Sequence, residues 1–287
     1  MMENNICDNL LNLAFSEPKK FNESVDKIVS TTLESLDKDL VVRKLLSLLD
    51  ITTLHDDDYK QAIEDIVLQS TFEIDGNRGV VAGICVYSNL LPLLNAINID
   101  KRISKVVVSG GFPTGQMSLE GKLHDIGFAI ENKADEIDVP INRGLFFEDI
   151  EELCIELNAM NSIVKQNPKA KLKVIIEAGE LKDFKNVYEA SKLAMTCGAD
   201  FIKTSTGKVS RGADIYSSAV MILAIKKFMD SNPNRTIGFK AAGGIRTSVQ
   251  AMQYYALMTY FFGEEYITKD TFRIGCSNLK QEIINNI

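Results

Sequence analysis

Two lysines occupy positions where the sequence predicts short buried strands. Lys203 lies in Phe201-Ile202-Lys203-Thr204-Ser205, and Lys240 lies further along in Ile237-Gly238-Phe239-Lys240-Ala241. Burial of an ammonium group is costly and favours the neutral amine. A neutral lysine attacks carbonyl carbon, so Lys203 is a candidate Schiff-base nucleophile. If the two strands are neighbours, each cation is expected to disfavour the charging of the other.

A carboxylate interrupts a third apolar run, at Asp138 in Glu136-Ile137-Asp138-Val139-Pro140. A carboxylate beside a nucleophilic lysine is suited to moving protons while a carbinolamine forms and loses water. The resulting iminium would serve as an electron sink for an adjacent carbon–carbon bond, so no metal or organic cofactor is expected. A structural ion pair between Asp138 and Lys240 is the alternative, and the two interpretations are compatible.

The elements that must position these side chains alternate along the chain from residue 46 onward. Eight short apolar runs are separated mostly by amphipathic stretches of helical period, which is typical of parallel strands covered by helices. The runs are Leu46–Ile51, Val80–Val86, Val106–Ser109, Glu136–Pro140, Lys173–Glu177, Phe201–Thr204, Ile237–Ala241 and Phe272–Cys276. The clearest helical stretches are Asp58–Ser70, Leu119–Asn132, Phe147–Val164, Phe184–Cys197, Asp214–Met229 and Ser248–Phe262.

Eight such units predict a (β/α)8 TIM barrel. An open doubly wound sheet is the competitor, but it normally has a glycine-rich turn after its first strand, and the turn here, Asp50–Leu54, has no glycine. Residues 1–45 read as two or three further helices. We therefore expect an N-terminal helical extension, 1–45, and a barrel domain, 46–287.

In a barrel, the carboxyl ends of the strands form the active site. Several polar residues fall at or near such ends and are candidates for substrate binding. They are Asp50, Thr52, Cys85 and Lys173. For Cys85 two interpretations stay open, a small buried apolar residue or a reactive thiol near the substrate.

Three patches predict a phosphate site. Gly243 and Gly244 follow the seventh strand, where backbone N–H groups can approach an anion. Gly275 and Ser277 lead into the last helix, and the loops after strands seven and eight commonly bind phosphate in such barrels. The loop after the sixth strand adds Thr206-Gly207-Lys208. Ordinary turn glycines and a helix cap are the alternative interpretation.

Composition limits the remaining classes. The formal net charge is −7 and the sequence pI is about 5.1, which argues against a nucleic-acid-binding or anionic-membrane surface. There is no apolar stretch long enough to span a membrane. The five cysteines are widely separated and there are only two histidines, so neither a disulfide framework nor a metal site is predicted, and a cytoplasmic protein is expected.

Together these motifs closely resemble deoxyribose-phosphate aldolase, a class I, Schiff-base aldolase family. The matching segments are Leu49–Leu54, Ala134–Val139, Leu172–Leu181, Gly198–Lys208, Gly238–Thr247 and Arg273–Ser277. The resemblance implies reversible cleavage of 2-deoxy-D-ribose 5-phosphate to acetaldehyde and D-glyceraldehyde 3-phosphate.

The resemblance also implies residue roles. Lys203 would form the Schiff base, with Lys240 and Asp138 as its proton-relay partners. Asp50 and Thr52 would lie near the substrate hydroxyls, and the glycines, Lys208 and Ser277 would hold the phosphate. This chain differs from the family pattern at Ala241, at Asn278 and in having no tyrosine in its last residues, Asn286-Ile287.

Two other functions are compatible with the same residues. One is a different Schiff-base sugar-phosphate aldolase, and the other is a non-catalytic barrel that senses a sugar phosphate. A homo-oligomer, a dimer before larger assemblies, is expected.

Overall fold

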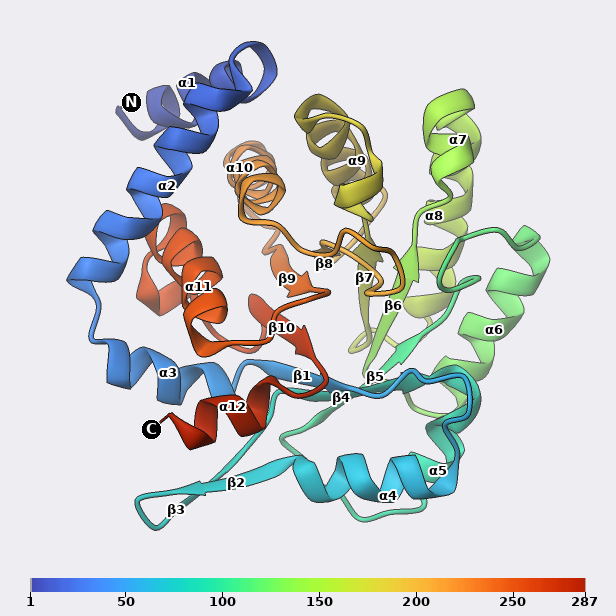
Figure 1. Cartoon of the computed structure of the whole chain (residues 1–287). Coiled ribbons are helices and arrows are strands. Elements are labelled where there is room, and N and C mark those ends of the chain that lie inside the picture. Colours follow the sequence, from blue (N-terminus) through green and yellow to red (C-terminus); the bar gives the residue numbers. More distant parts are fainter. Residues whose placement is uncertain (1, 287) are drawn as a thin grey trace.

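Eight parallel strands close into a barrel in the computed structural model, which describes residues 2–286 (Figure 1). Strand β1 pairs with both β4 and β10, and this pairing closes the sheet. The barrel strands are β1 (Leu49–Thr52), β4 (Gly83–Tyr87), β5 (Ser104–Val108), β6 (Glu136–Pro140), β7 (Lys171–Ile175), β8 (Phe201–Lys203), β9 (Gly238–Ala242) and β10 (Phe272–Cys276). Each of them overlaps one of the eight predicted runs, so the (β/α)8 prediction is confirmed.

The strands alternate between two chemical faces. In β7, Leu172 and Val174 belong to the large apolar core between the strands and the helices, whereas Lys173 belongs to a buried ionic network. A separate, small apolar cluster inside the barrel consists of Leu54, Cys85, Val106 and Val108. Because interior and exterior residues alternate along a barrel strand, a charged interior can coexist with an apolar outer face.

Helices cover the outside of the barrel, as Figure 1 shows. The ones that follow barrel strands are α4 (Lys60–Gln69), α5 (Leu91–Asn95), α6 (Leu119–Glu131), α7 (Arg143–Glu148), α8 (Ile150–Val164), α9 (Phe184–Thr196), α10 (Ile215–Ser231), α11 (Ser248–Phe262) and α12 (Leu279–Asn285). Short 3-10 turns are η1 (Ser88–Leu90), η2 (Ala178–Glu180) and η3 (Glu264–Tyr266). The predicted helix Phe147–Val164 is divided at Asp149, whose side chain caps the start of α8.

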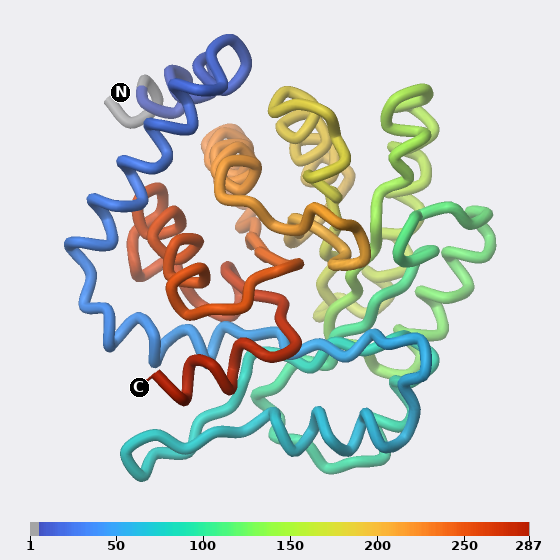
Figure 2. The backbone as a smooth tube through the Cα atoms, viewed as in Figure 1, coloured from blue at the N-terminus to red at the C-terminus, as the bar shows by residue number. Residues whose placement is uncertain are grey.

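The N-terminal helices are α1 (Met2–Ser16), α2 (Pro18–Ser35) and α3 (Lys38–Leu46). Helices α2 and α3 begin after polar breaks, and Asp37 caps α3 by accepting from the Leu40 amide. In Figure 2 the N-terminal segment runs beside the last helices of the chain, and α2 packs on α11 while α3 packs on α11 and α12. Their buried apolar residues, such as Phe21 and Leu45, join the same core as the barrel helices. The domain division at residue 45 stays a prediction.

One element was missed by the sequence analysis, the hairpin of β2 (Thr71–Ile74) and β3 (Asn77–Val80). Its turn is Asp75-Gly76, with φ of 51° and 75°, the backbone that a two-residue hairpin turn requires. The Asp-Gly pair was the available signal. Val80, predicted to begin a barrel strand, lies in this hairpin instead. No helix among residues 2–286 is long and apolar enough to cross a membrane.

Candidate active site

The two predicted lysines meet on one carboxylate inside the barrel. Lys203 Nζ on β8 lies 2.8 Å from Asp138 Oδ2, and Lys240 Nζ on β9 lies 2.9 Å from the same oxygen. Strands β8 and β9 are paired with Lys203 opposite Lys240, while Asp138 comes from β6. Lys240 and Asp138 are fully buried, and Lys203 is 3% exposed. The sequence-based expectation of neighbouring strands is therefore confirmed.

Opposing effects set the charges of this group. Burial raises the pKa of the Asp138 carboxyl, but Lys173, Lys203 and Lys240 outweigh it and hold the pKa well below its ordinary value. Burial lowers the pKa of the Lys240 ammonium, but the carboxylates of Asp138 and Asp50 outweigh it and the net pKa is raised. Lys240 therefore stays charged although a second lysine lies nearby, because two carboxylates flank it.

A cavity of about 640 Å³ opens at the carboxyl ends of the strands, above these lysines. Most of the predicted site residues line it. These are Thr52, Lys203, Thr206, Gly207, Lys208, Lys240, Gly243, Gly244, Gly275 and Ser277. The wall also includes Ala242, Cys276, Arg246, His55 and Asn278.

Four predicted residues do not line the cavity. Asp50, Asp138, Lys173 and Cys85 are fully buried. Asp138 contacts both cavity lysines, and Asp50 Oδ2 lies 2.6 Å from Lys240 Nζ. Cys85 packs in the small interior apolar cluster, where burial raises the pKa of its thiol. This environment fits the interpretation of Cys85 as a buried apolar residue.

A carboxylate outside the predicted set holds the loop after β8. Glu177 follows β7 in a left-handed conformation with φ of 53°, and it is 3% exposed. Its Oε1 accepts from the Thr206 amide at 3.1 Å, and its Oε2 accepts from the Thr206 hydroxyl at 2.6 Å. Thr206 Oγ1 in turn accepts from the Lys208 amide at 3.1 Å. Glu177 therefore fixes the backbone that presents Gly207 and Lys208 to the cavity.

The rim opposite the lysines is suited to an anion. Lys208 Nζ extends over the mouth and donates to the Leu54 carbonyl at 2.6 Å. Gly244 has φ of 82°, a conformation that side chains disfavour, and a side chain there would project into open space. Helix α12 begins at Leu279, directly after the cavity residues Gly275 and Ser277, so the expectation that its N-terminus helps to bind phosphate stays a prediction.

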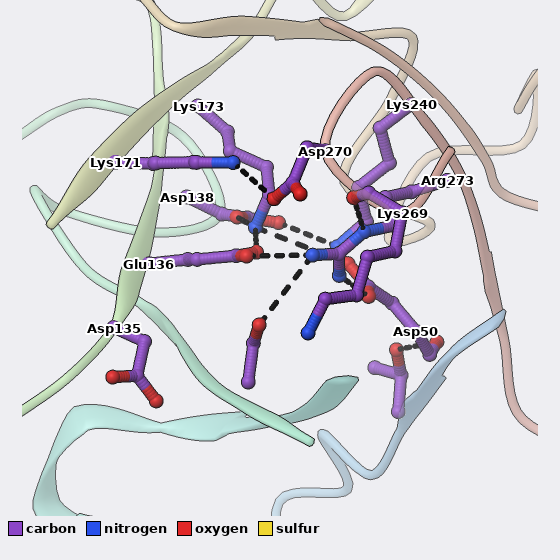
Figure 3. Close-up of polar contacts among 12 residues, drawn as sticks. Asp50, Asp135, Glu136, Asp138, Lys171, Lys173, Lys240, Lys269, Asp270 and Arg273 are labelled. Carbon is purple, nitrogen blue, oxygen red and sulfur yellow. Dashed lines mark hydrogen bonds and ion pairs between the residues drawn. The ribbon is translucent and has the colours of Figure 1, made fainter. Parts of the chain in front are cut away.

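Two further charged residues were not singled out from the sequence, Arg273 on β10 and Glu136 on β6. Both lie inside the barrel beneath the lysines, where Arg273 contacts Asp50 and lies 2.6 Å from Glu136 Oε1 (Figure 3). The spacing Glu136-Ile137-Asp138 indicates a shared strand face, and this was the available signal. Within residues 2–286, no group of three or more His, Cys, Asp or Glu side chains is arranged to hold a metal ion.

A (β/α)8 barrel with a cavity at the carboxyl ends of its strands, lined by buried lysines, defines the class of barrel enzymes whose active site lies at that end. The family model described as DeoC/LacD family aldolase matches residues 46–257. The chain belongs to this family of aldolases, which are carbon–carbon lyases.

Named relatives agree with the family. Deoxyribose-phosphate aldolase of Mus musculus is 35% identical over 258 residues, which cover 85% of this chain and 80% of the mouse protein. The Homo sapiens protein of that name is 34% identical over 258 residues, with the same coverages of 85% and 80%. The crystal structure of a putative deoxyribose-phosphate aldolase from Toxoplasma gondii ME49 has a TM-score of 0.72 at 22% identity, and the match covers 86% of this chain and 94% of that one. This structural likeness supports the fold.

Proposed function

We propose that this aldolase cleaves 2-deoxy-D-ribose 5-phosphate reversibly to acetaldehyde and D-glyceraldehyde 3-phosphate through a Schiff base on Lys203. The observation that carries the proposal is the position of Lys203 at the cavity wall. There Lys203 Nζ and Lys240 Nζ both lie within hydrogen-bond distance of Asp138 Oδ2. The relatives' names supply the substrate class.

The chemistry follows from the charges. The neutral amine of Lys203 attacks the C1 carbonyl carbon and the carbinolamine loses water, which leaves an iminium. Asp138 is ionised and can accept a proton, whereas the Lys240 ammonium is the adjacent protonated group that can return one. The C2–C3 bond then breaks as the C3 hydroxyl loses its proton. The electron pair passes into the enamine, and protonation at C2 with hydrolysis releases acetaldehyde.

The remaining cavity residues provide binding. Lys208, Gly207, Gly243 and Gly244 form the rim proposed to hold the phosphate, and Gly275 and Ser277 extend it on the far side. Thr52 faces the cavity and is proposed to contact a sugar hydroxyl. Asp50 is proposed to act through Lys240, because it is buried beneath the cavity wall. A cytoplasmic location and a dimeric assembly stay predictions.

Borohydride trapping with acetaldehyde tests the mechanism. The wild-type protein should gain one reduced two-carbon adduct, and Lys203→Ala should gain none. Lys208→Met is the matched control, because acetaldehyde has no phosphate. This variant should trap the adduct normally and should show a raised KM for deoxyribose 5-phosphate cleavage.

An adduct that persists in Lys203→Ala would contradict the assignment of the nucleophile. If acetaldehyde is trapped but deoxyribose 5-phosphate is not cleaved, the proposed Schiff base would be supported and the proposed substrate would be contradicted. An unchanged KM in Lys208→Met would contradict the phosphate rim.

A further inference from the structure

Six buried side chains form a closed ring of alternating charge beneath the cavity (Figure 3). Each is at most 3% exposed. Followed around, the ring is Asp138, Lys240, Asp50, Arg273, Glu136, Lys173 and Asp138 again. The two oxygens of every carboxylate point to different cations, so the ring has no open end.

The contacts around Asp138 show how the ring closes. Lys240 Nζ lies 2.9 Å from Asp138 Oδ2, and Lys173 Nζ lies 3.0 Å from Asp138 Oδ1. On the far side, Arg273 joins the two branches through separate nitrogens, Nη1 on Asp50 Oδ1 and Nη2 on Glu136 Oε1. Arg273 does not contact the cavity wall lysine Lys203, and it is fully buried.

A count of charges gives this ring a consequence for Lys203. The ring has three carboxylates and three cations, so it is balanced when all six are ionised. Lys203 is a seventh group outside the ring, and its amine contacts Asp138 Oδ2 at 2.8 Å. An ammonium there would add a positive charge to a buried ring that is already balanced, which burial disfavours. The neutral amine restores the balance.

We propose that Arg273 and Glu136 are positioning residues which, through this balanced ring, make Lys203 the lysine that gives up its proton. They do so without touching the substrate. The inference rests on the proposed function, because it assigns a purpose to the neutral form of the proposed nucleophile. Lys240 and Lys173 are each held between two or more carboxylates, whereas Lys203 has one carboxylate that it shares with both of them.

Other ionisable groups also face Lys203 and are common to all variants described below. Outside the ring, Cys85 from β4 and Glu177 after β7 lie near Lys203, and the cavity that Lys203 lines is also bordered by Lys208, His55 and Arg246. None of them is altered in the test, so a difference between variants reports the ring.

The test changes ring charge while it preserves side-chain shape. The profile of kcat/KM against pH for deoxyribose 5-phosphate reports ionisations of the free enzyme and of the free substrate, and the substrate phosphate contributes equally in every variant. Arg273→Met makes the ring negative, so Lys203 should keep its proton and the acidic limb should move up by about one pH unit. Glu136→Gln makes the ring positive, and the limb should move down by a similar amount.

Two further variants separate charge from packing. The double variant Arg273→Met/Glu136→Gln restores the balance, and its acidic limb should return to within a few tenths of a unit of wild type. Arg273→Lys keeps the charge but loses the two-pronged contact, so its limb should stay near wild type although its thermal midpoint falls. Lys122→Met is the control, because Lys122 forms a buried 2.5 Å ion pair with Glu156 outside the ring. It should lower the thermal midpoint and leave the limb in place.

Single variants whose limbs move in the same direction, or do not move, would overturn the proposal. The proposal would also be overturned if the double variant showed the summed rate losses of the single variants and its acidic limb did not return toward that of the wild type. If Arg273→Met does not fold, Glu136→Gln decides the question, and an unmoved limb in that variant overturns the inference. A wild-type protein that traps no acetaldehyde adduct would instead remove the proposed function.

Discussion

Lys203 and Lys240 converge on a single oxygen atom, Asp138 Oδ2, at 2.8 and 2.9 Å. The two amines are therefore within two hydrogen-bond lengths of each other, yet they have different surroundings. Asp50 lies 2.6 Å from Lys240 Nζ on its other side, whereas within the described residues Lys203 forms an ion pair with Asp138 alone. Lys240 is therefore held as a fixed cation between two carboxylates, and Lys203 is the amine proposed to react.

Removing that fixed cation should inactivate the enzyme. In Lys240→Leu, Asp138 loses one of the cations that share it, so Lys203 becomes its remaining close partner at Oδ2 and should retain its proton. We expect kcat/KM to fall by about 10²–10⁴ and the acidic limb of its pH profile to move upward. An unchanged profile would contradict the role of Lys240. Acetaldehyde trapping at raised pH gives a second measurement, because it should recover there.

Removing the shared carboxylate should affect stability and activity together. Asp138→Asn keeps the shape but leaves three lysines facing a neutral amide. Loss of one partner of a buried ion pair costs about 3–5 kcal/mol, so the free energy of unfolding in urea should fall by at least that much. Asp270→Asn, which removes an ion pair whose Asp270 is largely exposed, is the control and should cost below about 1 kcal/mol. Equal losses in the two variants would be inconsistent with a buried network.

The sequence predicted the barrel and the grouping of Lys203, Lys240 and Asp138 because each depends on local spacing. Lys203 and Lys240 interrupt apolar strands, and Asp138 does so in a third, so strand order alone brings them to one end of the barrel. Arg273 could not be placed in this way. Its partner Asp50 is 223 positions away, and the two meet only because β10 pairs with β1 when the barrel closes. The raised pKa of Lys240 depends on this closure as well, since Asp50 is one of its causes.

The two hydrogen bonds that Glu177 accepts from Thr206 should control substrate affinity more than turnover. Glu177→Ala removes both acceptors of Thr206 and frees the loop that contains Lys208. We expect KM for deoxyribose 5-phosphate to rise about tenfold, equal to about 1.4 kcal/mol of binding, with kcat changed less than threefold. Glu177→Gln keeps one acceptor oxygen, which can still accept from the Thr206 amide, and should recover part of the affinity. Trapping of phosphate-free acetaldehyde should be the same in both variants, and a loss there would place Glu177 in the chemistry instead.

Acid should destabilise the fold through the buried carboxylates. The pKa values of Asp50, Glu136 and Asp138 are all lowered in the folded protein, where burial raises them but the neighbouring Arg273 and lysines outweigh it. A lowered pKa means that their stabilisation is fully present above the ordinary values of 3.8 and 4.5, and is lost as the pH falls through the folded-state values. The thermal midpoint should therefore change little between pH 7 and 5 and fall steeply below about pH 4.

In Glu136→Gln the midpoint at pH 7 should be lower and the fall on acidification shallower, because one of the three carboxylates no longer titrates. Parallel curves for the two proteins would show that acid acts elsewhere in the molecule.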